Sequence, residues 1–579
     1  MQSSSITPKV KHLVLVGGGH SHLFVLKRLG MTPVPGLAIT VISRDIATPY
    51  SGSMPSFISG FCSRDEMHID LRPLAQFAGA RLIQASVDDI DLEAKTLKIA
   101  GRPPIEFDLL SLNIGSRPNA KALLGAEDYA CPVKPIDGFL ARWEAVRAEA
   151  TARVRDERPY SIVFVGGGPA SVELALAMQY RIHSECGLPL NTKSPLSITL
   201  ISSAPSLLPQ HLPTVGQKAL KTLQRRHIRV ELGQRVKRML PDSVQTADGG
   251  DFASDASFYA TGASLPDWPA RCGFALSDDG FLDTLPTLQS ASHDFVFIAG
   301  DAASIRGAVR PKSGVYAVRA GKPLAENLIR FATGRRLVNF HPQQRALALI
   351  SLGNKTALAS RGALSASGRV IWSIKQRIDS RFTAKFSRLP AMEADVALAP
   401  GLLDEKAEAQ LREHAMRCAG CGAKVASGVL DEVLNEVHGA DDAPRNPIED
   451  ASLIPLDDGR VLLQSIDQLS AFIDDPWLFA QIATNHCLSD IYAMGAEPHS
   501  ALAVVGLPSA SQALTKSSLR ELMQGCKRAL AENDCELLGG HTAENPLLQL
   551  GLSVNAFARA QDVIAKHALQ PGDVLIMSK

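Results

Sequence analysis

Two stretches of the chain share one pattern of apolar and polar positions. Residues 12–16 form a short apolar run that leads into three glycines and then into a helical pattern ending near residue 29. The same order of apolar run, glycine turn and helical pattern returns at 161–178. Such a unit is a strand, a tight turn and a helix whose first backbone N–H groups can hold a pyrophosphate. Two copies about 150 residues apart predict two Rossmann-like domains of α/β fold.

The glycines of the two turns hold corresponding places. Gly17 and Gly19 fill the first two places of the dinucleotide fingerprint in the first copy, and Gly166 and Gly168 fill them in the second. The third place of the first copy is His22, and we expect this replacement to loosen the packing of helix on strand. One such turn alone would be a weak signal, whereas the repeat favours two dinucleotide sites over two ordinary tight turns.

The strand that follows each turn lacks the carboxylate that usually binds a ribose hydroxyl. The segment 39–45 offers Ser43 at that place, and the segment 198–204 offers Ser202. The choice between NADH and NADPH therefore stays open.

Three further segments complete this architecture. Residues 107–118 and 256–266 each predict a strand that ends in a turn of small residues, and residues 295–303 predict a strand that ends at Gly300 and Asp301. The Asp301 carboxylate can accept hydrogen bonds from ribitol hydroxyls. Together with the two turns, these segments resemble the two-dinucleotide flavoproteins, and among them the type II NADH dehydrogenases, over about residues 10–388.

That resemblance implies two cofactors. FAD would lie on the first turn and near Asp301, while NAD(P)H would lie on the second turn with Glu173 near its nicotinamide. No cysteine pair follows the first turn, because Cys62 and Cys131 stand alone. We therefore do not expect a disulfide reductase, and electrons would pass from the flavin directly to an acceptor.

Shorter segments sharpen the resemblance. Three of them are similar to the flavoprotein module that is fused to selenide, water dikinases: residues 17–26, 48–60 and 310–327. This similarity places His20, His22 and the turn 49–52 near the flavin, and it implies that Lys312 approaches the flavin ring. The alternative is that the histidines are hydrogen-bonded residues of the core and that 49–52 is a simple turn.

Residues 370–389 combine an apolar stripe with many cations. Apolar side chains recur every three or four residues at Ile371, Ile374, Ile378 and Phe382, and Lys or Arg occupies much of the remainder. A basic amphipathic helix of this kind can lie on an anionic membrane surface, and type II NADH dehydrogenases dock in a similar way. The alternative is a helix that packs on its own domain. The Ala-rich acidic segment that follows predicts a linker.

Charge separates the two ends of the chain. The whole chain of 579 residues has a net charge of +1, but residues 410–579 hold 12 Lys and Arg against 22 Asp and Glu. Such an acidic region suits divalent cations and argues against nucleic acid as a partner. The length demands several domains, and no apolar stretch reaches the about 20 residues of a membrane span. With no signal-peptide core and irregularly spaced cysteines, we expect a cytoplasmic protein.

The stretch RCAGCGAKV at 417–425 concentrates thiols, glycines and a cation. Its pair Cys418 and Cys421 could be half of a zinc site or a redox pair, although no second pair follows and a polar helical segment precedes it. The third interpretation makes Cys421 a nucleophilic thiolate. The ammonium of Lys424 favours the thiolate and can neutralise phosphate charge.

Three acidic residues follow at the ends of apolar segments. Asp450, Asp467 and Asp490 terminate or follow such segments, so their carboxylates could converge. Carboxylate oxygens are ligands that hold Mg2+ between the phosphates of ATP. The sequence contains no P-loop motif, so ATP would bind in another way.

Residues 417–546 resemble selenide, water dikinase (selenophosphate synthetase), of the aminoimidazole ribonucleotide synthetase-like superfamily. The family's thiol-Gly-x-Lys loop matches 420–424, its metal aspartates match the same three acidic residues, and its second nucleotide-side loop matches Gly539, Gly540 and Thr542. The resemblance implies an α+β domain that converts ATP, selenide and water to selenophosphate, AMP and orthophosphate.

The resemblance also implies roles for single residues. Cys421 would handle the selenium and Lys424 the phosphates, while the flavoprotein would supply reduced selenium at the expense of NAD(P)H. Family members continue into a second domain that covers the nucleotide. We therefore expect weak or absent kinase activity in this chain, and an exposed apolar face through which the C-terminal domain forms a homodimer.

Five regions are expected along the chain. They are an FAD-binding domain at 1–125 and 285–330, an NAD(P)-binding domain at 126–284, a flavoprotein C-terminal region at 331–389, a linker at 390–412 and a shortened selenophosphate synthetase-like domain at 413–579. Two other functions stay open beside the bifunctional enzyme. One is an NAD(P)H:quinone dehydrogenase with an inactive appendage, and the other is a nucleotide-binding sensor without turnover.

Overall fold

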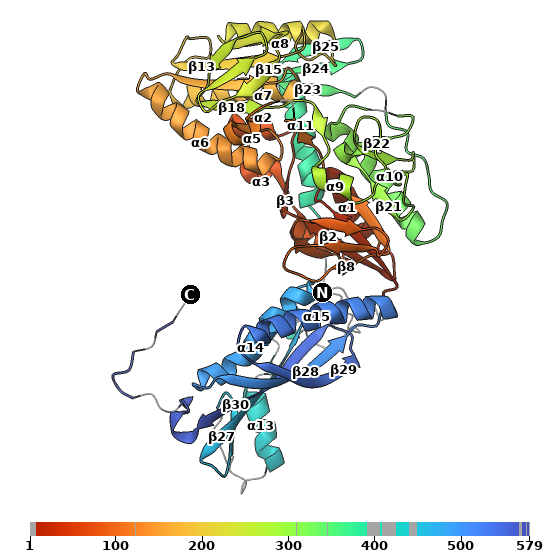
Figure 1. The fold of residues 1–579 in the computed structure, drawn as a ribbon, viewed down its shortest axis with the longest axis vertical. Helices are drawn as coiled ribbons and strands as arrows, with labels where there is room; N and C mark the ends of the chain where they lie inside the picture. Colours follow the sequence, from red (N-terminus) through yellow and green to blue (C-terminus); the bar gives the residue numbers. More distant parts are fainter. Residues whose placement is uncertain are drawn as a thin grey trace.

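The computed structural model is a mixed α/β structure with a large N-terminal part and a smaller C-terminal domain (Figure 1). The residues that it describes are 7–121, 123–308, 310–343, 346–390, 404, 406–407, 424–425, 427–438, 449–566, 570–574 and 576–577.

The first domain is built on a five-stranded parallel sheet of order β21-β9-β1-β2-β5. Its strands are β1 (Lys11–Val16), β2 (Leu37–Ser43), β5 (Arg81–Gln84), β9 (Leu109–Leu112) and β21 (Val296–Ile298), and its main helices are α1 (His20–Met31), α4 (Leu71–Phe77) and α10 (Gly314–Ala332). Leu13, Val14 and Leu15 of β1 are completely buried, because helices and loops cover both faces of the sheet. The sheet unites the start of the chain with the segment around residue 296.

The second domain repeats this arrangement. Its five-stranded parallel sheet has the order β11-β18-β12-β13-β14. The elements are β11 (Ala130–Pro132), α6 (Ile136–Arg155), β12 (Tyr160–Val165), α7 (Pro169–Glu185), β13 (Leu196–Ser202), α8 (Pro213–Arg225), β14 (Arg229–Leu232) and β18 (Ala256–Tyr259). The predicted pair of strand–turn–helix units is confirmed as β1–α1 and β12–α7.

The other elements of the N-terminal part are mostly short. They are β3 (Ala47–Pro49), α2 (Met54–Ile58), α3 (Arg64–Met67), β4 (His68–Asp70), β6 (Asp89–Asp91), β7 (Thr96–Lys98), β8 (Ile105–Glu106), β10 (Arg117–Pro118), α5 (Ala126–Tyr129), β15 (Val236–Met239), β16 (Ser243–Thr246), β17 (Asp251–Ala253), β19 (Ala263–Ser264), α9 (Asp267–Arg271), β20 (Leu282–Thr284), η1 (Gly300–Ala302), β22 (Ala303–Ile305), β23 (Ala348–Ser351), β24 (Ala357–Arg361), β25 (Leu364–Gly368) and α11 (Arg369–Ser387).

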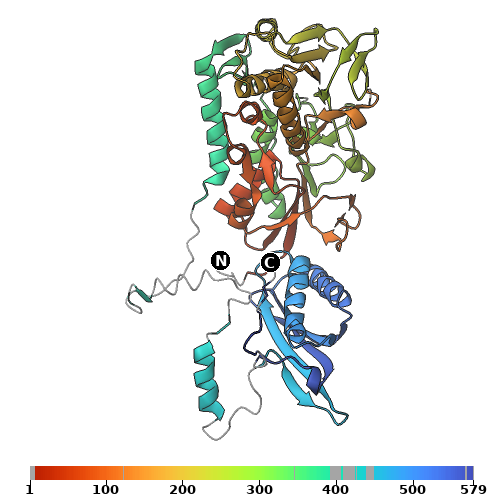
Figure 2. The ribbon, with the colours of Figure 1, turned by 90° about the vertical axis from the view of Figure 1, so that its left-hand side faces the viewer.

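Helix α11 runs along the side of the N-terminal part (Figure 2) and packs on it with polar residues in its middle and with Phe386 near its end. Lys375 and Asp379 are buried, with 2.7 Å between Nζ and Oδ2, and Lys375 also donates a hydrogen bond to the carbonyl of Gly52. Ile374 and Ile378 are each 44% exposed. The predicted helix is confirmed, and these two side chains of its apolar stripe face away from the domain. A main-chain carbonyl faces the helix, and it requires a hydrogen-bond donor.

The C-terminal domain is a five-stranded mixed sheet with helices on one face. The strand order is β26-β27-β30-β28-β29, and only β28 and β29 run parallel. Its elements are α13 (Ser427–His438), β26 (Ser452–Pro455), β27 (Arg460–Ser470), α14 (Pro476–Ala493), β28 (Pro498–Leu507), α15 (Gln512–Ala531), β29 (Glu536–Glu544), β30 (Gln549–Arg559) and η3 (Ala560–Asp562). Helices α14 and α15 pack together over the buried face of the sheet. Ile466, Leu502 and Phe557 are exposed apolar side chains of the strands.

The segment predicted as the second nucleotide-side loop is a strand instead. Gly539, Gly540 and Thr542 lie within β29, which pairs with β28 along its length. A Cβ on Gly540 would stand 2.0 Å from the carbonyl oxygen of Ala503, so close strand packing already requires this glycine. The two glycines look like a turn in sequence, whereas in the fold they allow the irregular pairing of an edge strand.

No helix in the described part of the chain is both long and apolar enough to cross a membrane.

Candidate functional site

The first glycine turn is closed by a side chain that follows β9. Gly17 has a left-handed φ of +93°, and a Cβ there would stand 2.5 Å from the carbonyl oxygen of Asn113. A Cβ on Gly19 would stand 2.2 Å from the Asn113 side-chain oxygen. That oxygen accepts a hydrogen bond from the backbone N–H of Ser21 (3.0 Å), and the Asn113 amide nitrogen donates to the carbonyl of Ala299 (2.9 Å). Asn113 therefore ties the glycine turn to the end of β21.

The second glycine turn is more open. Gly166 has a φ of +128°, and a Cβ there would stand 2.4 Å from the carbonyl oxygen of Ala260, so this position requires glycine. A Cβ on Gly168 would meet no atom within 4 Å. Packing does not demand glycine at 168, whereas close approach of a ligand to the start of α7 would demand it.

Helices α1 and α7 start in the same way. Each begins after a glycine, which provides no side-chain cap, and neither has an acidic residue in its first turn; in α1 the N–H of Ser21 already donates to Asn113. The first N–H groups of a helix lack partners within the helix, and the partial positive charge there favours an anion. Both helix starts therefore have the chemistry of a pyrophosphate site.

His22 has the environment of the alternative interpretation, a hydrogen-bonded residue of the core, and its place near the flavin stays a prediction. Its side chain is fully buried, with Nδ1 2.7 Å from the carbonyl oxygen of Gly17 and Nε2 2.9 Å from the hydroxyl of Ser111. Burial lowers the pKa of His22 to about 4, so the ring stays neutral. Both ring nitrogens are used inside the protein. The ring also ties helix α1 to β9, so the expected loosening of helix on strand is absent.

His20, at the first position of α1, differs from His22. Its Nε2 is buried and has no hydrogen-bond partner among the described residues. The ring packs edge-on against Tyr50 and Phe382, with 5.5 and 5.7 Å between ring centroids. A buried nitrogen without a partner, at a helix start suited to an anion, fits a ligand that carries its own hydrogen-bonding groups.

Asp301 is buried where β21 ends, in η1. Its Oδ2 lies 2.8 Å from Nζ of Lys134 and 3.3 Å from the hydroxyl of Ser116. Gly300 leaves no room for a side chain, because a Cβ there would stand 2.4 Å from the amide nitrogen of Asn113. The carboxylate is thus at the same sheet edge as the first glycine turn, as a ribitol-binding residue would be. Together with His20, these features fit FAD.

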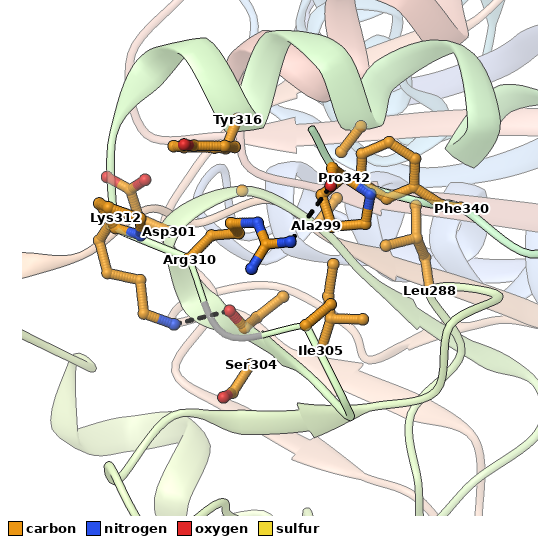
Figure 3. Close-up of a pocket in the computed structure, with 15 residues that line it drawn as sticks. Leu288, Ala299, Asp301, Ser304, Ile305, Arg310, Lys312, Tyr316, Phe340 and Pro342 are labelled. Carbon is orange, nitrogen blue, oxygen red and sulfur yellow. Dashed lines mark hydrogen bonds between the residues drawn. The ribbon is translucent and has the colours of Figure 1, made fainter. Parts of the chain in front are cut away.

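A small cavity of about 40 Å³ adjoins Asp301 (Figure 3). This space holds a few water molecules and is far too small for a flavin. Lys312 lines it, and its ammonium donates to the carbonyl of Ala303 (2.7 Å) and lies 3.7 Å from the centroid of the Phe281 ring. Lys312 is thus bound within its own domain, and its approach to the flavin ring stays a prediction.

Glu173 links α7 to the hairpin that precedes α11. Its Oε1 accepts a hydrogen bond from the backbone N–H of Ser351 in β23 (2.6 Å). Burial raises the pKa of Glu173 to about 7, and the neighbouring charge of Lys375 opposes this shift. The carboxyl group therefore changes its charge near neutral pH. Its place beside the nicotinamide stays a prediction.

The three aspartates predicted to bind a metal lie in one region of the C-terminal domain. Asp450 precedes β26, Asp467 lies in β27 and Asp490 lies in α14. Burial raises the pKa of Asp490, and the charges of Asp467 and Asp450 raise it further. The three carboxylates therefore repel one another, which is the electrostatic condition that a bound cation relieves.

Cationic side chains reach two of these carboxylates. Nζ of Lys566 lies 2.7 Å from Oδ1 of Asp450, and Nζ of Lys424 lies 3.4 Å from Oδ1 of Asp467. Oδ2 of Asp467 is buried without a hydrogen-bond partner, and Nε2 of His486 lies 3.4 Å from it. Within the described residues, no group of three or more His, Cys, Asp or Glu side chains is arranged to hold a metal ion. The donor chemistry fits Mg2+, and its coordination by the aspartates stays a prediction.

The structure describes only one of the two residues predicted to be catalytic. Cys421 lies outside the described residues, whereas Lys424 forms its ion pair with Asp467. The glycines of β29 are three strands away from Asp467 of β27, a distance of about 14 Å across the sheet. Within the sheet, these glycines are therefore not neighbours of Asp467.

Sequence reasoning missed three residues of these sites. Asn113 and Lys134 reach their partners only through the tertiary fold. His486 had a signal, because it lies four residues before Asp490 on a predicted helix and such residues share one helix face.

These features define a class of protein. Two parallel sheets, each with a glycine turn before a helix, form a two-dinucleotide oxidoreductase, and an α+β domain is joined to its end. The family profile described as pyridine nucleotide-disulphide oxidoreductase matches residues 11–321, and the chain belongs to this family. The profile described as AIR synthase related protein, N-terminal domain, matches residues 448–559.

Solved structures show the same fold for the N-terminal part. The sulfide:quinone oxidoreductase of Aquifex aeolicus aligns with 65% of this chain and 91% of its own, with a TM-score of 0.55 and 18% identity. NDH2 of Plasmodium falciparum, solved in complex with NADH, aligns with 65% of this chain and 96% of its own, with a TM-score of 0.55 and 13% identity.

The C-terminal domain is similar to selenide, water dikinases. The enzyme of Bdellovibrio bacteriovorus is 36% identical over 165 residues, which cover 28% of this chain and 47% of that protein. The chain spans about half the length of the curated relatives it matches. The chain is therefore a fusion of a flavin- and nicotinamide-dependent type of oxidoreductase with a selenophosphate synthetase-like domain.

Proposed function

We propose that the N-terminal part oxidises NAD(P)H through bound FAD and supplies reduced selenium to the fused selenide, water dikinase-like domain. One observation carries this proposal. A single chain combines two glycine-turn helices with a domain related to selenide, water dikinases. A fusion keeps an unstable, reactive product close to the domain that consumes it, because the two sites share one effective concentration.

The residues of the flavoprotein have separate tasks in this proposal. Gly17 and Gly19 let the first turn pack against Asn113, which leaves the start of α1 to the FAD pyrophosphate, and Asp301 holds the ribitol hydroxyls. His20 offers its free Nε2 to the bound flavin. Gly168 admits NAD(P)H, with Glu173 on the nicotinamide side. FAD supplies two-electron chemistry, and the protein orients the two dinucleotides.

The C-terminal domain would phosphorylate selenide with ATP. In this proposal Cys421 binds selenium as a thiolate and Lys424 neutralises phosphate charge. Mg2+ held by Asp450, Asp467 and Asp490 would bridge the phosphates of ATP. The balance is ATP, selenide and water to selenophosphate, AMP and orthophosphate.

The first experiment is an anaerobic titration of the purified full chain. We expect a flavin absorbance spectrum that bleaches on addition of NADH or NADPH. We also expect NAD(P)H oxidation to accelerate when a selenotrisulfide, RS–Se–SR, is added. NAD(P)H and one proton then give RS–SeH, RSH and NAD(P)+. A bound flavin whose oxidation rate is indifferent to selenium would contradict the selenium acceptor while leaving the oxidoreductase intact.

The second experiment tests the C-terminal domain within the full chain. We expect Asp467→Asn to weaken Mg2+ binding by the full chain, measured by calorimetry, because one proposed metal ligand loses its charge. The matched control is Asp458→Asn, an exposed acid paired with Arg460 in the turn between β26 and β27. Equal loss in both variants, or in neither, would contradict the assignment of Asp467.

A second candidate function is an NAD(P)H:quinone dehydrogenase that docks on a membrane. The exposed side of α11 favours it, because Ile374 and Ile378 lie in solvent beside Arg377 and Arg381. An exposed apolar stripe with cations can bind an anionic bilayer. Flotation with vesicles containing phosphatidylserine distinguishes the candidates: binding that is lost in Ile374→Ser/Ile378→Ser supports docking, and no binding by the wild type contradicts it.

We also propose that the chain has the domain boundaries predicted from its sequence and that it forms a homodimer. Ile466, Leu502 and Phe557 leave an apolar surface on the open side of the C-terminal sheet. We propose that a second copy of the chain covers it. Sedimentation velocity would show a dimer that Ile466→Lys dissociates, and a wild-type monomer would contradict it.

A further inference from the structure

The FAD-binding domain and the C-terminal domain contact each other through helices α14 and α15. Figure 1 shows α15 directly below the β8 region of the first domain, and Figure 2 shows the same two parts of the chain against each other from the side. Residues on the two sides of this contact are about 400 positions apart in sequence, for example Arg102 and Asp475 at a separation of 373.

Four charged side chains meet at the centre of this contact. We name Arg81, Arg102, Asp475 and Glu521 the charge cluster. Arg102 donates two parallel hydrogen bonds to Asp475, each of 2.9 Å. Arg81 donates to Oδ1 of Asp475 (3.1 Å) and to both oxygens of Glu521, one of them at 3.0 Å. Two cations therefore share two carboxylates, and the net charge is zero.

The charge cluster is excluded from solvent. The side chains of Arg81, Arg102, Asp475 and Glu521 are 12, 6, 10 and 3% exposed. Ion pairs on a surface contribute little to stability, whereas removal of one member of a buried pair leaves an uncompensated buried charge and is strongly destabilising. The bidentate geometry also fixes the orientation of one domain on the other.

Further contacts surround the charge cluster. The ring of Trp477 lies between two guanidinium groups, 5.2 Å from Arg102 and 5.5 Å from Arg528. At the rim, Nη1 of Arg520 lies 2.5 Å from Oε1 of Glu106. These side chains belong to both domains, so the contact extends well beyond one ion pair.

The main chain also crosses the contact. The backbone N–H of Lys9 donates to the carbonyl of Ser509 (3.3 Å), and the backbone N–H of Ser511 donates to the carbonyl of Lys9 (2.7 Å). Lys9 and Ala510 thus form a parallel β-bridge. The segment just before β1 is therefore fixed to the segment just before α15.

We propose that the C-terminal domain binds the FAD-binding domain directly through the charge cluster, so that the two form one body without help from the connecting segment. The partner surface is the helical layer of a selenide, water dikinase-like domain, with the start of α14 and the middle of α15 as its contacts. This inference concerns assembly and does not depend on the proposed reaction.

The docking leaves the rest of the C-terminal domain accessible. Asp475 caps the start of α14, whereas Asp490 lies 15 residues along the same helix, about 22 Å away. The open side of the sheet faces away from α14 and α15, which cover its other side. The proposed metal residues and the apolar sheet surface therefore stay clear of the interdomain contact.

The test cuts the chain between the domains. A recognition sequence for a specific protease is inserted between residues 395 and 396 of the full chain, and complete cleavage is verified on a denaturing gel. Gel filtration at 150 mM and 500 mM salt then shows whether the halves separate. We expect the halves to elute together at both salt concentrations, because buried pairs are screened only weakly. Separate elution of the wild-type halves would overturn the proposal.

Variants identify the contact that holds the halves together. We expect Arg81→Met/Arg102→Met to raise the dissociation constant of the cleaved halves at least 100-fold. Arg158→Met is the matched control, because its pair with Asp156 is exposed and lies in the second domain. Far-UV circular dichroism checks that each half is folded. Elution of the double variant as one complex with unchanged affinity would overturn the role of the charge cluster.

A charge exchange at the rim gives a test that does not disturb the core. Arg520 and Glu106 are 33 and 34% exposed, so both tolerate substitution. Glu106→Arg places two cations together and should weaken the complex about tenfold, and Glu106→Arg/Arg520→Glu should restore it. Failure of the exchange to restore affinity would contradict this orientation of the two domains.

Discussion

The two glycine turns of the N-terminal part follow the same backbone path and differ in the atoms that lie next to their glycines. In the first turn, Asn113 occupies the space that side chains on Gly17 and Gly19 would need. In the second turn, Gly166 is similarly confined by a carbonyl, but Gly168 faces empty space. The first turn is therefore a fixed part of the core, whereas the second is open on the side where a dinucleotide would approach.

The third place of the fingerprint shows the same difference. His22 fills this place in the first turn and satisfies both ring nitrogens. Ser171 fills it in the second turn, where its hydroxyl is buried without a hydrogen-bond partner among the described residues. The comparison teaches that the fingerprint specifies the path of the backbone, while the surrounding strands decide whether a turn is closed or open.

The largest effect is expected for Gly17→Ala. The new Cβ would clash with the Asn113 carbonyl at 2.5 Å in a left-handed conformation, so the free energy of unfolding should fall by more than about 3 kcal/mol. Flavin content should fall with it. Urea denaturation and the ratio of flavin to protein absorbance measure both, and a stable, yellow variant would contradict the closed first turn.

Gly168→Ala should separate binding from folding. Its Cβ meets no protein atom, so the melting temperature and the flavin content should stay within error of the wild type. The KM for NAD(P)H should rise about 100-fold, because the methyl group occupies the approach of a pyrophosphate to α7. Steady-state kinetics with both coenzymes measures this, and an unchanged KM would contradict nucleotide binding at the second turn.

His22→Gln should change how stability depends on pH. The folded-state pKa of His22 is lowered from 6.5 to about 4, so the unfolded chain binds a proton that the folded chain refuses. Stability is therefore complete above pH 6.5 and is lost as the pH falls toward 4. The variant should lose about 3 kcal/mol less than the wild type over this range. Exposed His341→Gln is the control, and equal acid sensitivity of all three proteins would contradict a neutral His22.

The smallest effect is expected for Ser202→Glu, which restores the carboxylate at the end of β13. The Ser202 hydroxyl now accepts a hydrogen bond from the backbone N–H of Ala204 (3.2 Å). A carboxylate there should bind a ribose 2′-hydroxyl and repel a 2′-phosphate, so the preference for NADH over NADPH should rise about tenfold in kcat/KM. Ser43→Glu at the first turn is the matched control and should leave this ratio unchanged.

The sequence predicts the parts of this fold that repeat at short range. The strand–turn–helix units need only neighbouring residues, and Gly17 and Gly166 lie where the pattern places them. Contacts between segments that are distant in sequence cannot be predicted in this way. Arg81 and Arg102 carry no pattern in sequence that points to Asp475, because only the tertiary fold brings them together.

The failures have physical causes in particular residues. Helix α11 shows that periodicity identifies a helix but not its buried face when the buried partners are polar, as Lys375 and Asp379 are. Paired glycines at 539 and 540 indicate a turn by composition, yet backbone crowding within a sheet also demands glycine. The place of His22 in a motif predicts looser packing of helix on strand, whereas its buried hydrogen bonds tie the two together.

Asn113 also sets a distance within the first domain. Its amide has one accepting and one donating end, and these point to the start of α1 and to the strand end beside Asp301. In the proposed FAD site, the length of this one side chain would fix the distance between the pyrophosphate side and the ribitol side. An aspartate at this position would turn oxygen against oxygen at Ala299 and push the two ends apart.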